Sequence, residues 1–91
     1  MKCLEIITLR SATNPEKGAI RELVKKMRGS DTKEPAPALV LYRNASVGND
    51  ISIHLQRDTG NGHMGKSPMG LQLARLFSQY GLVSHSIWIE E

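Results

Sequence analysis

The stretch ALVLYRNASVGNDISIHLQR, residues 38–57, decides the fold. Two runs of aliphatic and β-branched residues, 38–45 and 51–57, flank the short polar segment SVGND, a pattern typical of two antiparallel strands joined by a hairpin turn. In the second run apolar and polar residues alternate, which predicts a strand with one buried face: Ile51, Ile53 and Leu55 against Ser52, His54 and Gln56.

A strand and a helix are predicted before this hairpin. Residues 2–9, KCLEIITL, are apolar on both alternating sets, as in a central strand that is buried on both faces. Asn14 followed by Pro15 is a helix start signal, and apolar residues then recur at helical spacing. We therefore expect a helix from about residue 15 to residue 28, with Gly29 as its stop signal.

A helix and a strand are predicted after the hairpin. Ser67 and Pro68 repeat the cap-then-proline start signal after the polar loop RDTGNGHMGK, residues 57–66. Gly81 ends the helix. The segment that follows it, LVSHSIWIEE at residues 82–91, predicts a fourth strand. The apolar stripe of the helix consists of Met69, Leu73, Leu76, Phe77 and Tyr80.

The element order β-α-β-β-α-β predicts a ferredoxin-like α+β fold, in which two helices cover one face of a four-stranded antiparallel sheet. We expect a single domain over residues 1–91, since this length builds one core. The uncovered face would keep apolar residues, drawn from Leu39, Leu41, Ile87, Ile89 or Trp88 according to the strand register. A second copy is the simplest cover, so we expect a symmetric homodimer.

Composition narrows the classes of function. No apolar run approaches the roughly 20 residues that a membrane span needs, and the single cysteine, Cys3, favours a reducing cytoplasm. A net charge of +3 permits anionic ligands. Nucleic-acid binding of the RRM type is disfavoured, because the two central strands lack the aromatic residues that stack on bases.

The segment GNGHMGKS, residues 60–67, matches the phosphate-loop pattern G-x-x-x-x-G-K-[ST]. A nucleotide hydrolase is disfavoured, because those enzymes use a larger, mostly parallel sheet and a strand-end Asp for the metal. Two interpretations remain open. The segment is either an ordinary loop with a helix cap, or it binds an anion without hydrolysis through Lys66, Ser67 and the backbone amides.

Several polar and aromatic side chains are candidates for chemistry. His54 lies on the polar side of its strand, where it could act as a general base, and Arg43 and Asn44 could bind and orient an anionic oxygen. A surface strand end or a packing residue is the simpler interpretation for each of them. Candidate ligand-binding residues are Tyr42, His63, Lys66, Ser67, His85 and Trp88. We expect no metal site, since no ligand pair has suitable spacing.

The chain resembles the antibiotic-biosynthesis-monooxygenase-like family of dimeric α+β barrel proteins. The resemblance rests on the proline-started helix NPEKGAIRELVKKM, on the strand end YRN at residues 42–44, and on His63 before the Ser67–Pro68 pair. The sequence departs from that family in two places. Members commonly have a tryptophan at the end of the strand over 51–57, where this chain has Leu55, Gln56 and Arg57, and an aromatic residue or histidine after the Ser-Pro pair, where it has Met69.

This resemblance implies a homodimer and a cofactor-free monooxygenase-like enzyme acting on a small aromatic or enolic substrate. His54 would deprotonate the substrate, with Arg43 and Asn44 stabilising the resulting anion. The alternative is a non-catalytic dimeric domain that binds a small molecule or an anion. If the chain is an enzyme, we expect a closed apolar pocket that contains His54 or Arg43. If it is a binding domain, we expect a filled core.

Overall fold

The structure is a computed structural model that describes residues 2–10, 14–28, 38–58 and 65–91. Its four strands form one antiparallel sheet in the order β2-β3-β1-β4, so the predicted ferredoxin-like fold is confirmed, with β1 as a central strand. The elements are β1 (Lys2–Arg10), α1 (Asn14–Arg28), β2 (Ala38–Arg43), β3 (Ile51–Asp58), α2 (Pro68–Phe77) and β4 (Leu82–Ile89).

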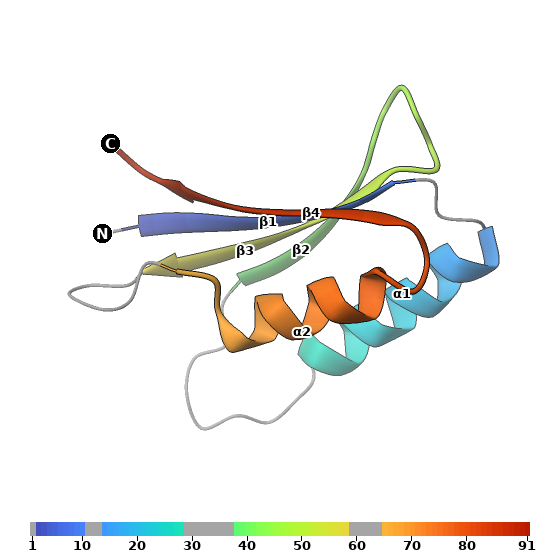
Figure 1. Cartoon of the computed structure of the whole chain (residues 1–91), viewed down its shortest axis with the longest axis horizontal. Coiled ribbons are helices and arrows are strands. Elements are labelled where there is room, and N and C mark those ends of the chain that lie inside the picture. The colour runs from blue at the N-terminus through green and yellow to red at the C-terminus, as the bar shows by residue number, and fades with distance from the viewer. Residues whose placement is uncertain (1, 11–13, 29–37, 59–64) are drawn as a thin grey trace.

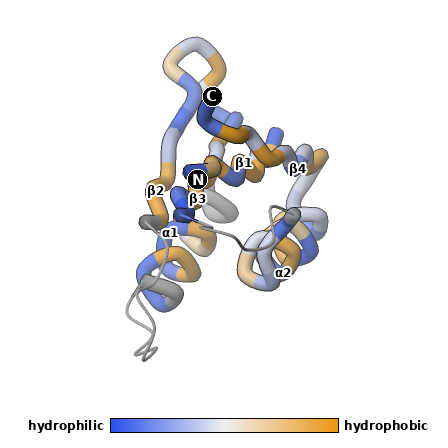
Figure 2. The backbone as a smooth tube through the Cα atoms, turned by 90° about the vertical axis from the view of Figure 1, so that its left-hand side faces the viewer, coloured by the Kyte–Doolittle hydropathy of each residue, from blue (hydrophilic) through white to orange (hydrophobic). Residues whose placement is uncertain are grey.

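Both helices lie on the same face of the sheet (Figure 1). Figure 2 shows α1 beneath β2, and α2 on the side of the sheet where β4 lies. The apolar side chains between these layers form the core because their burial removes hydrocarbon surface from water. The buried cluster contains Ile7, Leu9, Ile20, Val24, Leu39, Ile51, Ile53, Leu55, Leu73 and Phe77.

The strand register assigns each side chain to one of the two faces. Cys3, Glu5, Ile7 and Leu9 point toward the helices, and so do the β4 residues paired with them, among them His85 and Ile87. The other face, called the open face below, carries the alternate residues. It includes Leu4, Ile6, Val40, Tyr42, His54 and Trp88. Of the five residues considered for this face from the sequence, only Trp88 lies on it, since Leu39, Leu41, Ile87 and Ile89 face the helices.

Three predicted boundaries are corrected by the structure. The strand expected over residues 38–45 ends at Arg43, because the Asn44 side chain turns the backbone: its Oδ1 accepts from the amides of Ser46 and Val47 at 2.8 and 3.0 Å. Helix α2 ends at Phe77, before Tyr80, and β4 ends at Ile89, before the last two residues. No helix within the described ranges is long and apolar enough to cross a bilayer.

Candidate functional site

A fully buried carboxylate lies between the sheet and α2. Glu5 is 0% exposed, because it occupies a helix-facing position of β1 between Cys3 and Ile7. Its Oε1 accepts the hydroxyl of Ser67 at 2.7 Å, and its two oxygens accept the Ser67 amide at 3.1 and 3.3 Å. These hydrogen bonds matter energetically, since an ionised carboxylate without partners is very costly to bury.

Two nitrogen-bearing side chains complete the surroundings of Glu5. The Nε2 of His85 on β4 lies 2.5 Å from Glu5 Oε2, and the Nη2 of Arg57 on β3 lies 3.5 Å from Oε1. Arg57 Nη2 also donates to the carbonyl of Gly65 at 2.6 Å. The guanidinium therefore supplies positive charge beside a carboxylate that solvent does not reach. We call Glu5, Arg57, Ser67 and His85 the Glu5 cluster.

The Glu5 cluster also begins helix α2. Ser67 is the N-cap residue, and its Oγ accepts from the amide of Gly70 at 2.9 Å. In a capping box, a Glu or Gln at the third helical position bonds back to the amide of the cap residue. Gly70 stands at that position here, and Glu5 from β1 supplies the carboxylate instead. A Cβ at residue 70 would overlap Glu5 Oε2, so this position requires glycine.

The candidate catalytic residues lie on different sides of the sheet. Arg43 pairs with the core residue Ile51 and shares its helix-facing side, whereas His54 points onto the open face. Tyr42 packs against His54 there, with ring centroids 4.4 Å apart. Tyr42, Arg43 and Asn44 also line one hollow of about 280 Å³ at the end of β2, but His54 is not among the residues that line it.

The pKa of His54 is lower than that of an ordinary surface histidine. Its partial burial lowers its pKa from the usual value of 6.5, because desolvation disfavours the imidazolium form. The ring is therefore mainly neutral near pH 7, and a neutral imidazole is able to accept a proton.

The candidate binding residues fall into separate places. Ser67 and His85 are brought together by Glu5, while Lys66 is exposed and His63 lies outside the described residues. Trp88 is 61% exposed on the open face, and its Nε1 donates to the hydroxyl of Ser86 at 3.0 Å.

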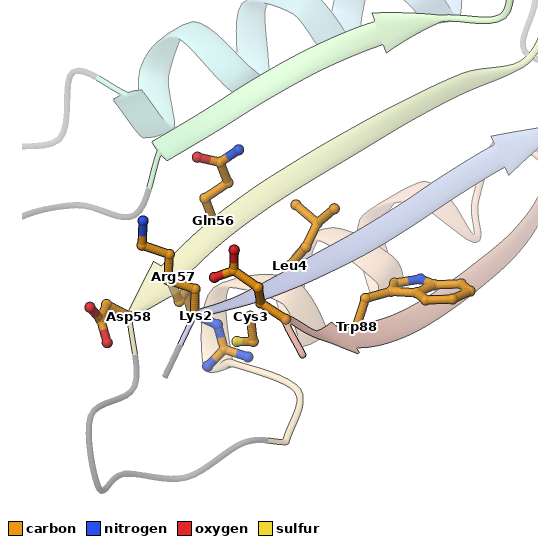
Figure 3. A pocket seen from close by; sticks show the side chains of 8 residues that line it. Lys2, Cys3, Leu4, Gln56, Arg57, Asp58 and Trp88 are labelled. Atoms are coloured by element: carbon orange, nitrogen blue, oxygen red, sulfur yellow. The ribbon is translucent and has the colours of Figure 1, made fainter.

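A groove of about 580 Å³ lies at the end of the sheet where β1 begins and where β3 and β4 end. Figure 3 shows Gln56, Leu4 and Trp88 projecting from these three strands along it. Leu4 and Trp88 supply apolar surface, and the charged residues are of both signs. The groove is lined by Lys2, Cys3, Leu4, Gln56, Arg57, Asp58, Trp88 and Glu90. Its size is in the range of small-molecule sites.

Two residues of the Glu5 cluster were not among the candidates from the sequence. Glu5 shares the alternation of Cys3, Ile7 and Leu9, which are all buried, and Arg57 continues the alternation of the core residues of β3. A charged residue that shares one face of a strand with buried apolar residues is the signal that would have identified Glu5 and Arg57.

Comparison with known proteins gives no family model, no curated protein and no solved structure that matches this chain. Within the described ranges, no three His, Cys, Asp or Glu side chains gather in a way that could hold a metal ion.

Proposed function

We propose that the chain is a small-molecule-binding domain that works as a homodimer, with the open face as the surface shared by the two copies. The observation that carries this proposal is the apolar and aromatic character of that face. Val40 and Tyr42 are exposed on it, and the single-chain structure places no described helix or strand over them. Exposed apolar surface of this kind marks interaction sites in soluble proteins.

The size of the open face supports a self-associating surface. The strands are 6 to 9 residues long. With strands about 4.8 Å apart and a rise of about 3.3 Å per residue, a four-stranded face covers roughly 500 Å². Two such faces bury about 1,000 Å², the area that a biological interface should reach. Packing of the two sheets in this way would form the dimeric α+β barrel expected from the family resemblance.

The distribution of charge on the open face supports the same arrangement. The described positions in the middle of this face carry no Lys, Arg, Asp or Glu side chain. Charged side chains of both signs lie at the strand ends. Lys2 stands opposite Asp58 in the strand register at one end, and Arg10 contacts Asp50 at 3.7 Å at the other. Two copies can therefore meet without desolvating unpaired charges at the centre of the interface.

The groove at the end of the sheet supports an aromatic ligand that also carries an anionic group. Trp88 offers a flat face for ring stacking, with Leu4 beside it, and Lys2 supplies positive charge. We place this protein in the cytoplasm, a location supported by its single cysteine.

Binding of 8-anilinonaphthalene-1-sulfonate, an aromatic sulfonate, tests the proposed site. Because Trp88 is the only tryptophan, its quenching and energy transfer to the probe report binding at the groove. Trp88→Ala, followed through the fluorescence of the probe, should weaken binding about tenfold.

The control Leu71→Ala removes an exposed apolar side chain from α2 and should leave binding unchanged. Equal affinity of the two variants would refute the groove as the site.

A second candidate, a cofactor-free monooxygenase-like enzyme, is favoured by the neutral His54 beside Tyr42. His54 would accept a proton from a phenolic or enolic substrate, which makes the substrate anion easier to oxidise with oxygen. Oxygen uptake with 1,4-naphthohydroquinone tests this candidate. Uptake catalysed by the wild type should fall about 100-fold in His54→Gln and persist in Leu71→Ala. Catalysis that survives in His54→Gln, or is absent from the wild type, would eliminate it for this substrate class.

A further inference from the structure

The phosphate-loop-like segment ends at a helix start that already holds a negative charge. Gly65, Lys66 and Ser67 are the described residues of this segment, and they lead directly into α2. Helix starts attract anions, because their free amides and the helix dipole present positive charge. At this helix start the anion in place is the carboxylate of Glu5, 62 residues away in the sequence.

The polar partners of Glu5 come from three different parts of the fold. Ser67 donates through its amide and its hydroxyl, and the side chains of His85 and Arg57 approach from β4 and β3. The carboxylate is 0% exposed, and the side chains of His85 and Arg57 are 7% and 16% exposed. An anion from solvent could therefore use these donors only if Glu5 moved away.

We infer that Glu5 is an internal ligand that closes the anion-binding position at the start of α2 to phosphate and other external anions. The chain keeps the sequence pattern of a phosphate loop, but a carboxylate from β1 occupies the helix start that follows this pattern. This inference does not depend on the proposed binding of a small molecule at the groove.

The test replaces the internal carboxylate with a free one. Melting temperatures are measured for the wild type and Glu5→Ala in formate, phosphate and chloride salts of equal ionic strength. Glu22→Ala is the matched control, since it removes one carboxylate from an exposed pair with Lys25. Relative to chloride, formate should raise the melting temperature of Glu5→Ala by about 5 °C. The wild type and Glu22→Ala should show only the small general effect that these salts have on any protein.

A further variant removes the charge of residue 5 and keeps the volume of its side chain. Glu5→Gln leaves no room for a free anion and should not respond to formate. If Glu5→Ala is unfolded in chloride, recovery of its folded signal in formate or phosphate supports the inference. The inference is overturned if Glu5→Ala shows no specific response to either anion. It is also overturned if phosphate raises the melting temperatures of the wild type and of Glu22→Ala well beyond the general salt effect and Ser67→Ala abolishes that rise.

Discussion

The Oε1 atom of Glu5 accepts the hydroxyl of Ser67 at 2.7 Å, although 62 residues separate the two in the sequence. This hydrogen bond joins the centre of the sheet to the first residue before α2. A helix cap is ordinarily built from neighbouring residues. Here the carboxylate comes from β1, so the start of α2 and its position on the sheet depend on the same contact.

Gly70→Ala should destabilise the protein by about 3 kcal/mol, because the new methyl group would overlap the Glu5 carboxylate and force it out of its hydrogen bonds. Gly18→Ala is the matched control, since a Cβ on this exposed residue of α1 meets nothing within 4 Å. That change should stabilise the helix by up to about 1 kcal/mol. Urea denaturation measures both. A Gly70→Ala variant as stable as the wild type would contradict the geometry described for Glu5.

Ser67→Ala should lower the free energy of unfolding by about 2 kcal/mol, because it removes the cap of α2 and one donor to a buried carboxylate. Ser78→Ala provides the comparison, since the Ser78 hydroxyl bonds the Arg75 carbonyl at an exposed position. The cost of that change should be below about 0.5 kcal/mol. If urea denaturation gives the two variants a similar loss in the free energy of unfolding, Ser67 contributes no more to stability than an ordinary surface serine.

His54 should make folding sensitive to mild acid. Its pKa is lowered by burial from 6.5, so below that pH the unfolded chain binds a proton that the folded protein resists. The stabilising contribution of neutral His54 is complete above the unfolded-state pKa and is lost as the pH falls through the lowered folded-state value. An NMR titration of the His54 ring should give a midpoint below 6.5. The stability advantage of the wild type over His54→Gln should shrink over the same range. A midpoint at or above 6.5 would contradict this account.

Local sequence signals were sufficient to predict the fold. The Ser67–Pro68 start of α2 and the alternation of Ile51, Ile53 and Leu55 depend on neighbouring residues and are confirmed. The end of β2 was misplaced, because Asn44 uses its side chain to form a turn where the sequence pattern continues as a strand.

The Glu5 cluster was harder to predict, because it depends on which strands become neighbours. Glu5 lies beside Arg57 and His85 only because β1 is inserted between β3 and β4. The alternation of β1 placed Glu5 among buried residues, but no local pattern indicates a partner 62 or 80 positions away. Likewise, the separation of His54 from Arg43 follows from a strand register that only the structure supplies.

Sedimentation equilibrium of the wild type, Val40→Lys and Leu71→Lys tests the homodimer most directly. Val40 lies on the open face and Leu71 is an exposed apolar residue of α2, so the two variants add the same charge at different surfaces. The wild type and Leu71→Lys should sediment at twice the 10.1 kDa of one chain, and Val40→Lys at 10.1 kDa. A wild type that stays at 10.1 kDa at every concentration, or a Val40→Lys variant that remains dimeric, would contradict the open face as the shared surface.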